Sequence, residues 1–497
     1  MLKNITKRLT SLYHSSNECY LFFFYFLFTF FIRFPFFFRD YIDRDESTFI
    51  LMGQSWVDGF LPYTQLWDLK PPITFLFFAS IIYVFGKSFL AIRIAGVILV
   101  SLTAFFTYKI GASIAQKKIG FWSGFFVLIL SSLFGSLQGV MSEHISITFF
   151  ISALYLLIIK KSNFSYLLAG LLLGLSLMTK LNLAYSILFI FLFLAWKFLK
   201  EKQVYSRLIK IFILGGAILS IILLTALPYY LNSNFQTWWT AVFKASLAYS
   251  GSKEHSIFKV IPLALLVVSF FIITKKKKLI DYKQKGIQLL LIASFGILFS
   301  FMKIGKANGH YLIQLYPTLL ILIVIAINNT KILKNLNYKP IVLVMAFLIP
   351  METYLEFKNI IDNKIKKGSF YNGEGIAVPN YFKEKQISSN NILFLEYHIG
   401  YWLLDKIPPT KSATHPSNIL REELFPHMQN TRKTKTEEIK FIFEDIRPNY
   451  IITRKNRRVF DKKMLAVNFY TNLQLLKNYT VLDTVESAVI HKRLELK

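Results

Sequence analysis

A single cysteine and a shortage of acidic side chains are the clearest deficits of this sequence. Its 497 residues include one cysteine, Cys19, and 28 Asp and Glu against 58 Lys and Arg. One cysteine permits no internal disulfide and no cysteine-based metal site. The chain also lacks a heptad pattern, a Cys/His cluster, a glycine-rich phosphate-binding loop and a repeat of about 20–50 residues. These absences exclude disulfide-stapled domains, zinc modules and solenoids.

Long apolar runs dominate what is present. Hydrophobic residues make up 54% of the chain, and its mean hydropathy is +0.45. Runs such as "CYLFFFYFLFTFFIRFPFFF" and "LAYSILFIFLFLAW" approach the ~20 residues that cross a ~30 Å hydrocarbon core. The pattern predicts a polytopic α-helical membrane protein. Its candidate apolar spans begin near residues 19, 71, 88, 119, 144, 164, 182, 207, 256, 287, 311 and 339.

The net charge of +30 is distributed in a way that favours a membrane over nucleic acid. Blocks such as "KKKK" at 275–278 and "KFLKEKQ" at 197–203 lie in short loops between apolar runs. The positive-inside rule and anionic headgroups account for such blocks, so we expect membrane lipids and no nucleic acid as partners. The N-terminus carries Lys3, Lys7 and Arg8 and precedes an uncleaved first span, so it is also expected in the cytoplasm.

Alternation from the cytoplasmic loops predicts which segments lie on the external side of the membrane. These are a first loop at about 39–71, loops near 141–144, 232–255 and 303–310, and everything after about residue 356. Twelve spans cannot connect a cytoplasmic start to an external tail, so we expect 11 or 13 transmembrane helices. The weakest candidate, "ITFLFFASIIYVFG", is short enough to be half-buried or re-entrant.

The last part of the chain has a different character from the rest. It contains short β-like runs, "NILFLEY", "NYIIT" and "ESAVIHK", separated by charged, helix-compatible stretches such as "TKTEEIKFIFEDI". We therefore predict a transmembrane domain at 1–355 and a small soluble α/β extracytoplasmic domain at 356–497.

The first external loop, from Asp43 to Pro72, places polar chemistry beside a short helix. Phe49, Met52, Gly53 and Trp56 recur at helical spacing, which predicts an amphipathic helix lying on the membrane surface. Asp45 and Glu46 then stand at the N-terminus of that helix. One interpretation is that Asp45 caps the helix and Glu46 favours its dipole. The other is a carboxylate that takes a proton from an incoming hydroxyl, and the two are compatible.

Charged residues beside later apolar runs also have two interpretations. Lys70, before two prolines, either extends to a lipid headgroup or pairs with a substrate phosphate. Glu143, followed by His144, lies where a carboxylate must be hydrated, paired or functional. Lys180 interrupts one apolar run and either marks a turn between helices or binds an anionic headgroup or a diphosphate.

The stretch "KIGKANGHYLIQLYP" is a further candidate for phosphate binding. It joins Lys303 and Lys306 to a flexible Ala-Asn-Gly and then to His310 and Tyr311 at the start of an apolar run. Gly309 gives local backbone freedom, so the lysines and His310 can converge on a phosphate.

Together the predicted external face collects charges of both signs. The carboxylates are Asp43, Asp45, Glu46 and Glu143, and the cations are Lys70, Lys180, Lys303, Lys306 and His310. Such a face suits a reaction between a hydroxyl or amine and a lipid with an anionic leaving group, because the carboxylate handles the proton and the cations stabilise the departing phosphate. Asp58 and Asp68 are interpreted as structural.

Several of these segments together resemble a known family. "DRDESTFILMGQSWVDGFLPYTQLWDLKPP", "GKSFLAIRIAG", "SEHISITFF", "GLLLGLSLMTKLN" and "GHYLIQLYP" occur in the order seen in bacterial relatives of the dolichyl-phosphate-mannose–protein mannosyltransferases. That group has the GT-C fold and includes the aminoarabinose transferases that modify lipid A. The resemblance covers roughly residues 20–330, and the Asp-Glu pair with the Lys-Pro-Pro segment is its most specific part.

The resemblance implies sugar transfer from a polyprenyl-phosphate donor on the periplasmic side, usually with inversion. Asp45 matches the catalytic acidic position, Lys70 the basic residue of the Lys-Pro-Pro segment and Glu143 a second acidic position. Lys306 and His310 fall in the segment expected near the lipid phosphate. The tail has no matching motif, so the acceptor stays open among a lipid, a glycan and a protein of the cell envelope.

The expected site therefore has two parts. Asp45, Glu46 and Glu143 are predicted to be catalytic, and Lys70, Lys180, Lys303, Lys306, His310 and Tyr311 are predicted to bind the donor phosphate. A divalent cation, Mg²⁺ or Mn²⁺, is conceivable beside these carboxylates, which serve a metal-free mechanism equally well. The alternatives are a lipid-linked sugar flippase or transporter and a polysaccharide polymerase or ligase.

Overall fold

A computed structural model describes residues 17–40, 43–200, 204–251, 256–330, 348 and 350–494. The chain forms two compact units, each built from three segments. Unit 1 comprises Met1–Pro35, Ile92–Leu227 and Lys253–Leu355, and unit 2 comprises Phe36–Ala91, Pro228–Ser252 and Glu356–Lys497. The chain passes from unit 1 to unit 2 between residues 355 and 356, the position at which the sequence predicts a domain boundary. Unit 2 also contains residues 36–91 and 228–252.

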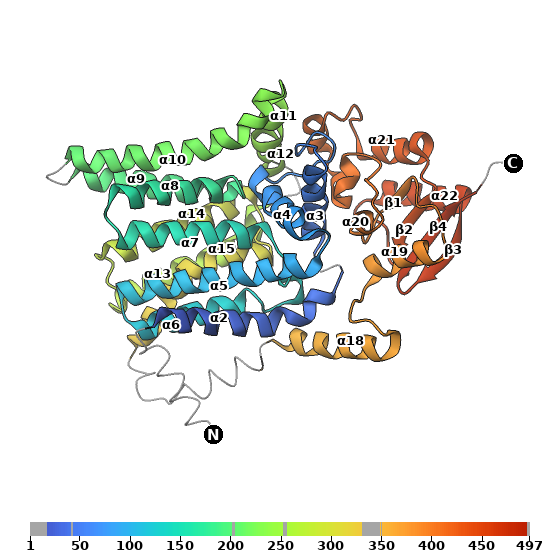
Figure 1. The fold of residues 1–497 in the computed structure, drawn as a ribbon. Helices are drawn as coiled ribbons and strands as arrows, with labels where there is room; N and C mark the ends of the chain where they lie inside the picture. The colour runs from blue at the N-terminus through green and yellow to red at the C-terminus, as the bar shows by residue number, and fades with distance from the viewer. Residues whose placement is uncertain are drawn as a thin grey trace. The chain divides into compact units, whose positions relative to one another are not determined.

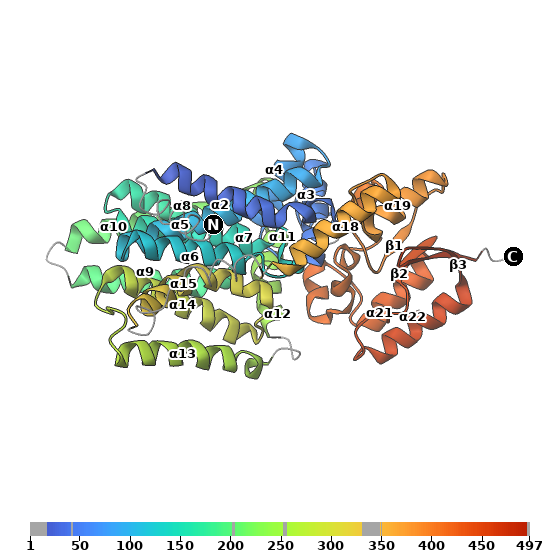
Figure 2. The same ribbon diagram turned by 90° about the horizontal axis from the view of Figure 1, so that it is seen from below.

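Unit 1 is a bundle of apolar helices that run roughly parallel or antiparallel to one another (Figures 1 and 2). Its helices are α2 (Glu18–Arg33), α5 (Phe89–Ile114), α6 (Lys117–Leu130), α7 (Ser142–Ile159), α8 (Asn163–Leu177), α9 (Ala184–Leu199), α10 (Val204–Leu231), α13 (Ile261–Lys276), α14 (Lys285–Ile304) and α15 (Leu312–Asn328). Among the described residues, seven helical segments are long and apolar enough to cross a membrane. The mostly helical, polytopic class predicted from the sequence is confirmed.

Small residues allow the helices of unit 1 to approach closely. A side chain at Gly296 in α14 would collide with the backbone of Ser186 in α9, and one at Gly120 in α6 would collide with the carbonyl of Tyr108 in α5. Such contacts are typical of membrane bundles, where close van der Waals packing replaces the hydrophobic driving force.

The predicted apolar spans correspond closely to observed helices. Eleven of the twelve starting points lie within about five residues of a helix start, and the span expected near residue 339 lies outside the described residues. The weakest candidate forms α4 (Pro72–Phe85), whose 14 residues extend only about 21 Å. That length is short of the ~30 Å hydrocarbon core, and α4 packs on α3 (Arg44–Val57) within unit 2. The total of 11 or 13 spans stays a prediction.

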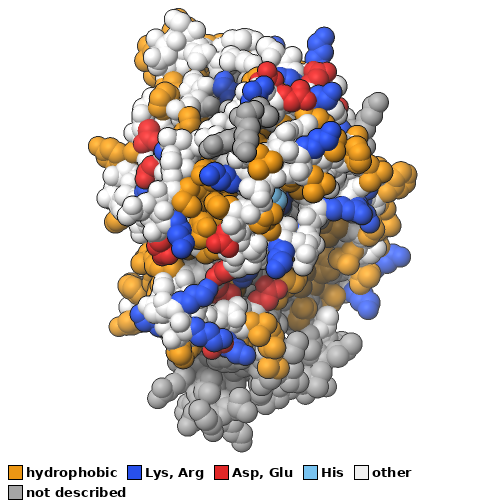
Figure 3. All heavy atoms as spheres, turned by 90° about the vertical axis from the view of Figure 1, so that its right-hand side faces the viewer, with side chains coloured by type: hydrophobic (Ala, Val, Ile, Leu, Met, Phe, Trp, Pro, Cys, Tyr) orange, Lys and Arg blue, Asp and Glu red, His pale blue; other side chains and the backbone are white. Residues whose placement is uncertain are grey.

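Unit 2 combines the α3–α4 pair with a small α/β layer at its C-terminal end. Its other helices are α11 (Phe235–Trp239), α12 (Ala245–Ser250), α18 (Met351–Lys367, from Glu356 onward), α19 (Glu374–Glu384), α20 (Gly400–Leu403), α21 (Lys435–Lys440) and α22 (Leu465–Asn478). Its strands are β1 (Ile392–Phe394), β2 (Tyr450–Arg454), β3 (Tyr479–Val485) and β4 (Ala488–Arg493). The face of unit 2 in Figure 3 mixes basic and acidic side chains.

The sheet of unit 2 has the order β1-β2-β4-β3. β1 pairs with β2 in parallel, with Leu393 opposite Ile451, and β2 and β3 both pair with β4 in antiparallel fashion. The three β-like runs seen in the sequence are confirmed as β1, β2 and β4. β3 escaped the sequence analysis because it is an exposed edge strand with a bulge between Val481 and Asp483, so it shows no buried alternation.

The helix-compatible stretch "TKTEEIKFIFEDI" is also helical. It forms α21, whose first turn is capped by the Thr434 hydroxyl accepting from the Glu437 amide at 3.2 Å, and continues into a π-helical turn at Phe441–Ile446. The apolar side chains of this segment enter the core of the α/β layer. That layer therefore has a hydrophobic core of its own.

Candidate functional site

The N-terminus of α3 is capped by Asp43 and not by Asp45. The Asp43 carboxylate oxygen Oδ1 accepts a hydrogen bond from the Asp45 amide at 2.8 Å, which is the usual N-cap arrangement. The interpretation of Asp45 as the cap is therefore wrong. Asp45 and Glu46 lie in the first turn, where the helix dipole favours negative charge. Because Asp43 supplies the cap, the Asp45 carboxylate is directed to other partners.

Asp45 lies between a lysine and a histidine from distant parts of unit 2. Its Oδ2 is 3.1 Å from the Lys70 ammonium, and its Oδ1 is 3.3 Å from Nε2 of His415. The Asp45 side chain is 23% exposed, so one side of the carboxylate remains accessible to a substrate. The structure thus joins two residues predicted from the sequence, Asp45 and Lys70, and adds a third that was not predicted.

Lys70 is held by protein groups, contrary to the interpretation that it extends to a lipid headgroup. Its ammonium lies 3.1 Å from Asp45 and 3.6 Å from the buried Asp68, and 5.0 Å from the centre of the Phe49 ring. The Tyr63 hydroxyl donates to the Lys70 carbonyl at 2.6 Å. Burial raises the pKa of the Tyr63 phenol well above its ordinary value, so the phenol stays protonated and keeps donating.

His415 is oriented by its own loop. Its Nδ1 accepts a hydrogen bond from the Ser417 amide at 3.1 Å, so in the neutral ring the proton resides on Nε2, the atom that faces Asp45. The preceding Thr414 hydroxyl accepts from the Trp67 amide at 3.3 Å, which ties this loop to the Lys70 segment. Nothing local in the sequence around His415 marks it, because its partner Asp45 lies 370 positions earlier.

Two residues of the short segment 396–398 contact the same end of α3. Glu396 pairs with Arg44 at 2.5 Å, and His398 Nε2 lies 2.9 Å from the Thr48 hydroxyl. Between them Tyr397 has a φ of 57°, a left-handed conformation that costs a residue with a bulky side chain about 1–3 kcal/mol. Burial, followed by the charges of His415 and Arg44, holds the pKa of His398 well below its ordinary value. His398 is therefore neutral at pH 7.

The residues around Asp45 do not fit a divalent cation. The Lys70 ammonium occupies the position between the Asp45 and Asp68 carboxylates where a cation would bind. Within the described part of the chain, no group of three or more His, Cys, Asp and Glu side chains is arranged to hold a metal ion. No chemical step is therefore derived through Mg²⁺ or Mn²⁺.

The remaining predicted catalytic and phosphate-binding residues form a second group, in unit 1. Glu143 is fully buried, forms an ion pair with Lys180, lies 3.7 Å from Nε2 of His310 and accepts from the Ser142 hydroxyl at 3.1 Å. The Lys180 ammonium also lies 4.7 Å from the centre of the Tyr311 ring. Four residues from three separate sequence motifs are thus brought together.

Other predicted residues have different surroundings. Glu46 is 1% exposed within α3. The Lys303 ammonium lies 6.0 Å from the centre of the Phe299 ring, and Lys306 follows α14, with its amide donating to the Phe301 carbonyl at 3.3 Å.

A buried amide pair next to the Glu143 segment was missed by the sequence analysis. Asn182 donates to the Gln314 side-chain carbonyl at 2.5 Å, and Gln314 donates back to Asn182 at 3.2 Å and to the Ser146 hydroxyl at 3.0 Å. Each polar group buried in an apolar bundle needs such a partner. The pair fixes the start of α15 beside α7.

An apolar helical bundle, an α/β layer and a carboxylate–lysine–histidine group together define a polytopic membrane protein with a polar site. Residues 69–230 match the family model described as dolichyl-phosphate-mannose-protein mannosyltransferase. This range contains Lys70, Glu143 and Lys180, and it excludes Asp45 and His415. The family resemblance predicted from the sequence is confirmed over this third of the chain.

Solved structures confirm the GT-C fold. ArnT from Cupriavidus metallidurans bound to undecaprenyl phosphate has a TM-score of 0.60 and 12% identity, covering 95% of this chain and 97% of that one. The apo form of ArnT from Cupriavidus metallidurans has a TM-score of 0.57 and 12% identity, covering 90% and 93%. No curated protein has a matching sequence. At this identity the likeness establishes the fold alone.

Proposed function

We propose that this chain is a membrane glycosyltransferase that moves a sugar from a polyprenyl-phosphate donor to an acceptor, with Asp45 as the general base. The observation that carries the proposal is the partly exposed Asp45 carboxylate held between Lys70 and His415. The family match over 69–230 and the ArnT fold support it, and the undecaprenyl phosphate bound to ArnT supports a polyprenyl-phosphate donor.

The proposed reaction is a direct displacement. The acceptor oxygen or nitrogen attacks the anomeric carbon and forms the new glycosidic bond, while the bond between that carbon and the phosphate oxygen breaks. The electron pair leaves with the polyprenyl phosphate, and the acceptor proton passes to Asp45. Lys70 stabilises the charge that develops on the departing phosphate. Attack opposite the leaving group inverts the configuration at the anomeric carbon.

His415 has a positioning role in this proposal. Its Nε2–H faces Oδ1 of Asp45, so it fixes the orientation of the carboxylate and leaves the Lys70-facing oxygen Oδ2 to exchange partners. When Lys70 turns to the donor phosphate, Asp45 loses its neutralising partner and becomes a stronger base. Donor binding and base activation are thereby coupled through one ammonium.

For unit 1 we retain the proposal that Lys180, Lys303, Lys306, His310 and Tyr311 bind the donor phosphate. The Glu143 carboxylate pairs with Lys180 and holds it in place within an apolar bundle, which supports a preformed anion site. A phosphate would compete with Glu143 for this ammonium. The proposed location is the inner membrane, with the segment from 356 to 497 on the extracytoplasmic side.

The test is Asp45→Asn, assayed in purified protein with a radiolabelled polyprenyl-phosphate sugar and acceptor membranes. We expect transfer, measured as label in the acceptor and free polyprenyl phosphate, to fall by about 10²–10⁴-fold. The matched control is Asp58→Asn, at the C-terminal end of the same helix, where Asp58 accepts from Gln54 at 2.9 Å. Near-wild-type turnover in Asp45→Asn would remove Asp45 from the mechanism.

The same assay separates the alternative functions. A flippase would carry label across a sealed bilayer without releasing polyprenyl phosphate. A polymerase or ligase would join lipid-linked glycans to each other or to a lipid core, so its product would carry more than one sugar unit per transfer. Transfer of single labelled sugars with release of polyprenyl phosphate supports the proposal.

A further inference from the structure

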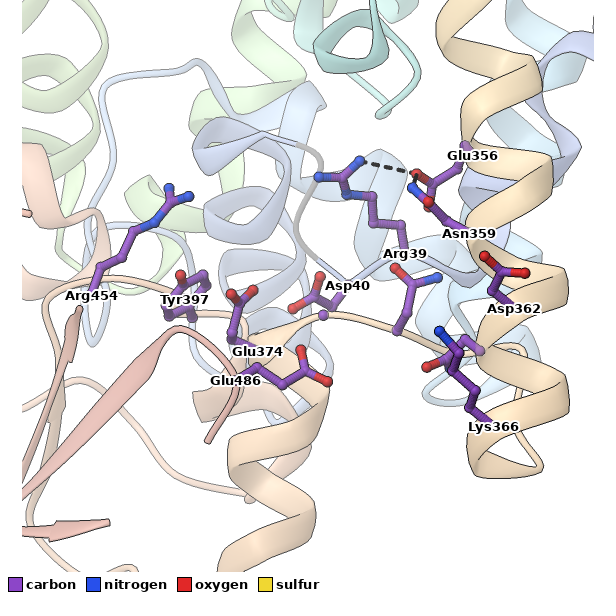
Figure 4. Close-up of a pocket in the computed structure, with 13 residues that line it drawn as sticks. Arg39, Asp40, Glu356, Asn359, Asp362, Lys366, Glu374, Tyr397, Arg454 and Glu486 are labelled. Atoms are coloured by element: carbon purple, nitrogen blue, oxygen red, sulfur yellow. Dashed lines mark hydrogen bonds and ion pairs between the residues drawn. The ribbon is translucent and has the colours of Figure 1, made fainter. Parts of the chain in front are cut away.

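Unit 2 contains a polar cavity of about 450 Å³ that the proposed catalytic group does not use (Figure 4). Its volume falls in the range of small-molecule sites, roughly 300–1,000 Å³. It is lined by the segment at Arg39–Asp40, by one face of α18, by the start of α19, by Tyr397, and by Arg454 and Glu486 of the sheet. All of these residues belong to unit 2.

The floor of the cavity is held by backbone and side-chain hydrogen bonds. Arg39 and Asn372 form a parallel bridge, and the Asp40 amide donates to the Asn372 carbonyl at 3.2 Å. The buried Asp40 carboxylate accepts from the Gly375 amide at the first turn of α19. Gly373 has a φ of 108°, and a side chain there would collide with that carboxylate. The polar groups of the floor are therefore held in place before any ligand binds.

Glu356 on α18 is the feature that points to a ligand. Its side chain is 97% buried, and Oε2 engages Arg39 at 3.2 Å and Asn359 at 3.0 Å. Its other oxygen, Oε1, has no hydrogen-bond partner among the described residues. Figure 4 shows the Glu356 carboxylate directed toward Arg39 on the cavity side of α18. An unsatisfied buried carboxylate oxygen is costly, and a ligand hydroxyl or amine would satisfy it.

The mixture of lining groups narrows the ligand chemistry. Five carboxylates, three cations and three asparagine amides line the cavity. The carboxylates are Asp40, Glu356, Asp362, Glu374 and Glu486, the cations are Arg39, Lys366 and Arg454, and the amides are Asn359, Asn363 and Asn372. A phosphate would be repelled by the carboxylates, and a polycation would leave the cations without partners. A ligand whose groups both donate and accept hydrogen bonds suits all of them, and adjacent sugar hydroxyls have this property.

We propose that this cavity binds a carbohydrate and that the carbohydrate is the sugar acceptor of the transfer reaction. The second part rests on the proposed function. Tyr397, on the cavity wall, immediately precedes His398, which contacts α3 through Thr48. Asp40, on the floor, is five residues from Asp45, so their Cα atoms are at most about 18 Å apart. An acceptor of more than one sugar unit can lie in the cavity and extend a hydroxyl toward Asp45.

The acceptor site is tested by direct binding, without transfer. Saturation-transfer-difference NMR on the full chain in detergent would use the methyl glycosides of glucose, galactose, mannose and N-acetylglucosamine, with inorganic phosphate and tetralysine as competing chemistries. We expect at least one methyl glycoside to bind. Glu356→Gln should weaken it by about tenfold or more, because a charged acceptor is lost. Glu384→Gln, an equal charge change at the exposed end of α19, should leave binding unchanged.

Further variants separate binding from folding and from catalysis. If Glu356→Gln lowers the melting temperature, its weaker binding could reflect loss of folding. Asp362→Asn, on a less buried part of the same cavity wall, then serves as the second variant in the same binding measurement. Asp45→Asn should bind the methyl glycoside normally while losing transfer. Binding without transfer in wild type would count against the proposed function alone. The cavity proposal is overturned if wild type binds none of the glycosides, if it prefers phosphate or tetralysine, or if neither wall variant weakens binding.

Discussion

At the scale of single residues, the chemistry of the candidate site depends on how one lysine is shared. Lys70 neutralises both Asp45 and the buried Asp68, at 3.1 Å and 3.6 Å. Two carboxylates this close to one ammonium leave it strongly bound in the absence of substrate. In the proposed reaction the donor phosphate is a diester with one negative charge, and it gains a second as its bond to the sugar breaks. That developing charge can draw Lys70 away from Asp45 while Asp68 stays paired with it. We therefore keep the interpretation of the buried Asp68 as structural.

Removing the Lys70 ammonium should reduce both activity and stability, and the two effects can be separated. Lys70→Ala leaves Asp68 buried without its cation, which should lower the free energy of unfolding by about 1–3 kcal/mol. The double variant Lys70→Ala/Asp68→Asn should recover most of that stability but no transfer activity. Thermal melts and initial transfer rates measure the two quantities. Recovery of activity in the double variant would mean that Lys70 acts only by maintaining the fold.

His398 should make unit 2 sensitive to acid. Its pKa is held well below the ordinary value by burial and by His415 and Arg44. The unfolded chain therefore binds a proton below about pH 6.5 that the folded chain does not. The stability contribution is complete above about pH 6.5 and is lost progressively as the pH falls toward the folded pKa.

Thermal melts at pH 7.5 and 5.5 test this expectation. Wild type should melt at a lower temperature at pH 5.5. In His398→Gln the difference between the two pH values should shrink, although His427 and His491 also have lowered pKa values and keep part of it. An undiminished pH difference in the variant would assign the acid sensitivity to other groups.

At the scale of secondary-structure elements, the start of α3 and the start of α19 are both set by aspartates. Asp43 caps α3 through the Asp45 amide, and Asp40 accepts from the Gly375 amide in α19. These two aspartates are three residues apart in the chain, so one short segment orients both the candidate base and the cavity floor. Local sequence patterns predict the helix α3. Its N-cap is Asp43, two residues before Asp45, which was the predicted cap.

Gly373→Ala should damage this junction. The residue has a φ of 108°, and an added methyl would collide with the Asp40 carboxylate, so we expect a loss of about 2 kcal/mol or more in unfolding free energy. Gly309→Ala is the matched control, because nothing lies within 4 Å of a methyl there and Gly309 has no left-handed φ. Equal melting temperatures for the two variants would show that the Asp40 segment relaxes freely.

At the scale of the whole molecule, unit 2 is assembled from three stretches of the chain. Residues 36–91 bring Asp45 and Lys70, and the C-terminal stretch brings His415, His398 and Glu396. The C-terminal part is thus more than an appended domain, since its side chains complete the surroundings of the candidate base. The sequence division at 355 and 356 describes the chain order and does not capture this assembly.

A chain shortened to residues 1–355 should therefore lose transfer activity even where it inserts into membranes. Loss of the C-terminal stretch leaves Asp45 without His415 and Arg44 without Glu396. Membrane fractionation and the transfer assay report insertion and activity separately. His415→Ala in the full chain is the milder comparison. It should lower kcat and leave the donor KM nearly unchanged, because His415 contacts the proposed base and has no proposed contact with the donor. Full activity in the shortened chain would make the C-terminal stretch dispensable for chemistry.

Much of the fold could be predicted because its signals are local. Hydropathy marks apolar helices directly, since each must be about 20 apolar residues long to cross a membrane, and eleven of twelve predicted segments coincide with described helices. Three of the four strands were predicted because short β-like runs are also a local signal. β3 was missed because its exposed, bulged edge carries no alternation.

The candidate site was predicted only in part. Asp45 and Lys70 lie 25 positions apart within one recognisable segment. Glu143, Lys180 and His310 were predicted as site residues because each is a polar or charged residue beside an apolar run. Their pairing into two groups, one in each unit, depends on tertiary packing. His415, Glu356 and Tyr397 have no local signal, because an isolated polar residue in a soluble-looking tail is the ordinary case.

The sequence by itself determined the class of this protein, its apolar helices and the segment that carries Asp45, because hydrophobic length and residue spacing act over short stretches of chain. Only the tertiary structure decided which charges meet. In the folded unit Asp43 caps α3, His415 lies beside Asp45, and Glu356 lines a cavity. The physical reason is that an ion pair or a buried hydrogen bond depends on distance in space, and distant segments reach that distance only when the whole unit has packed.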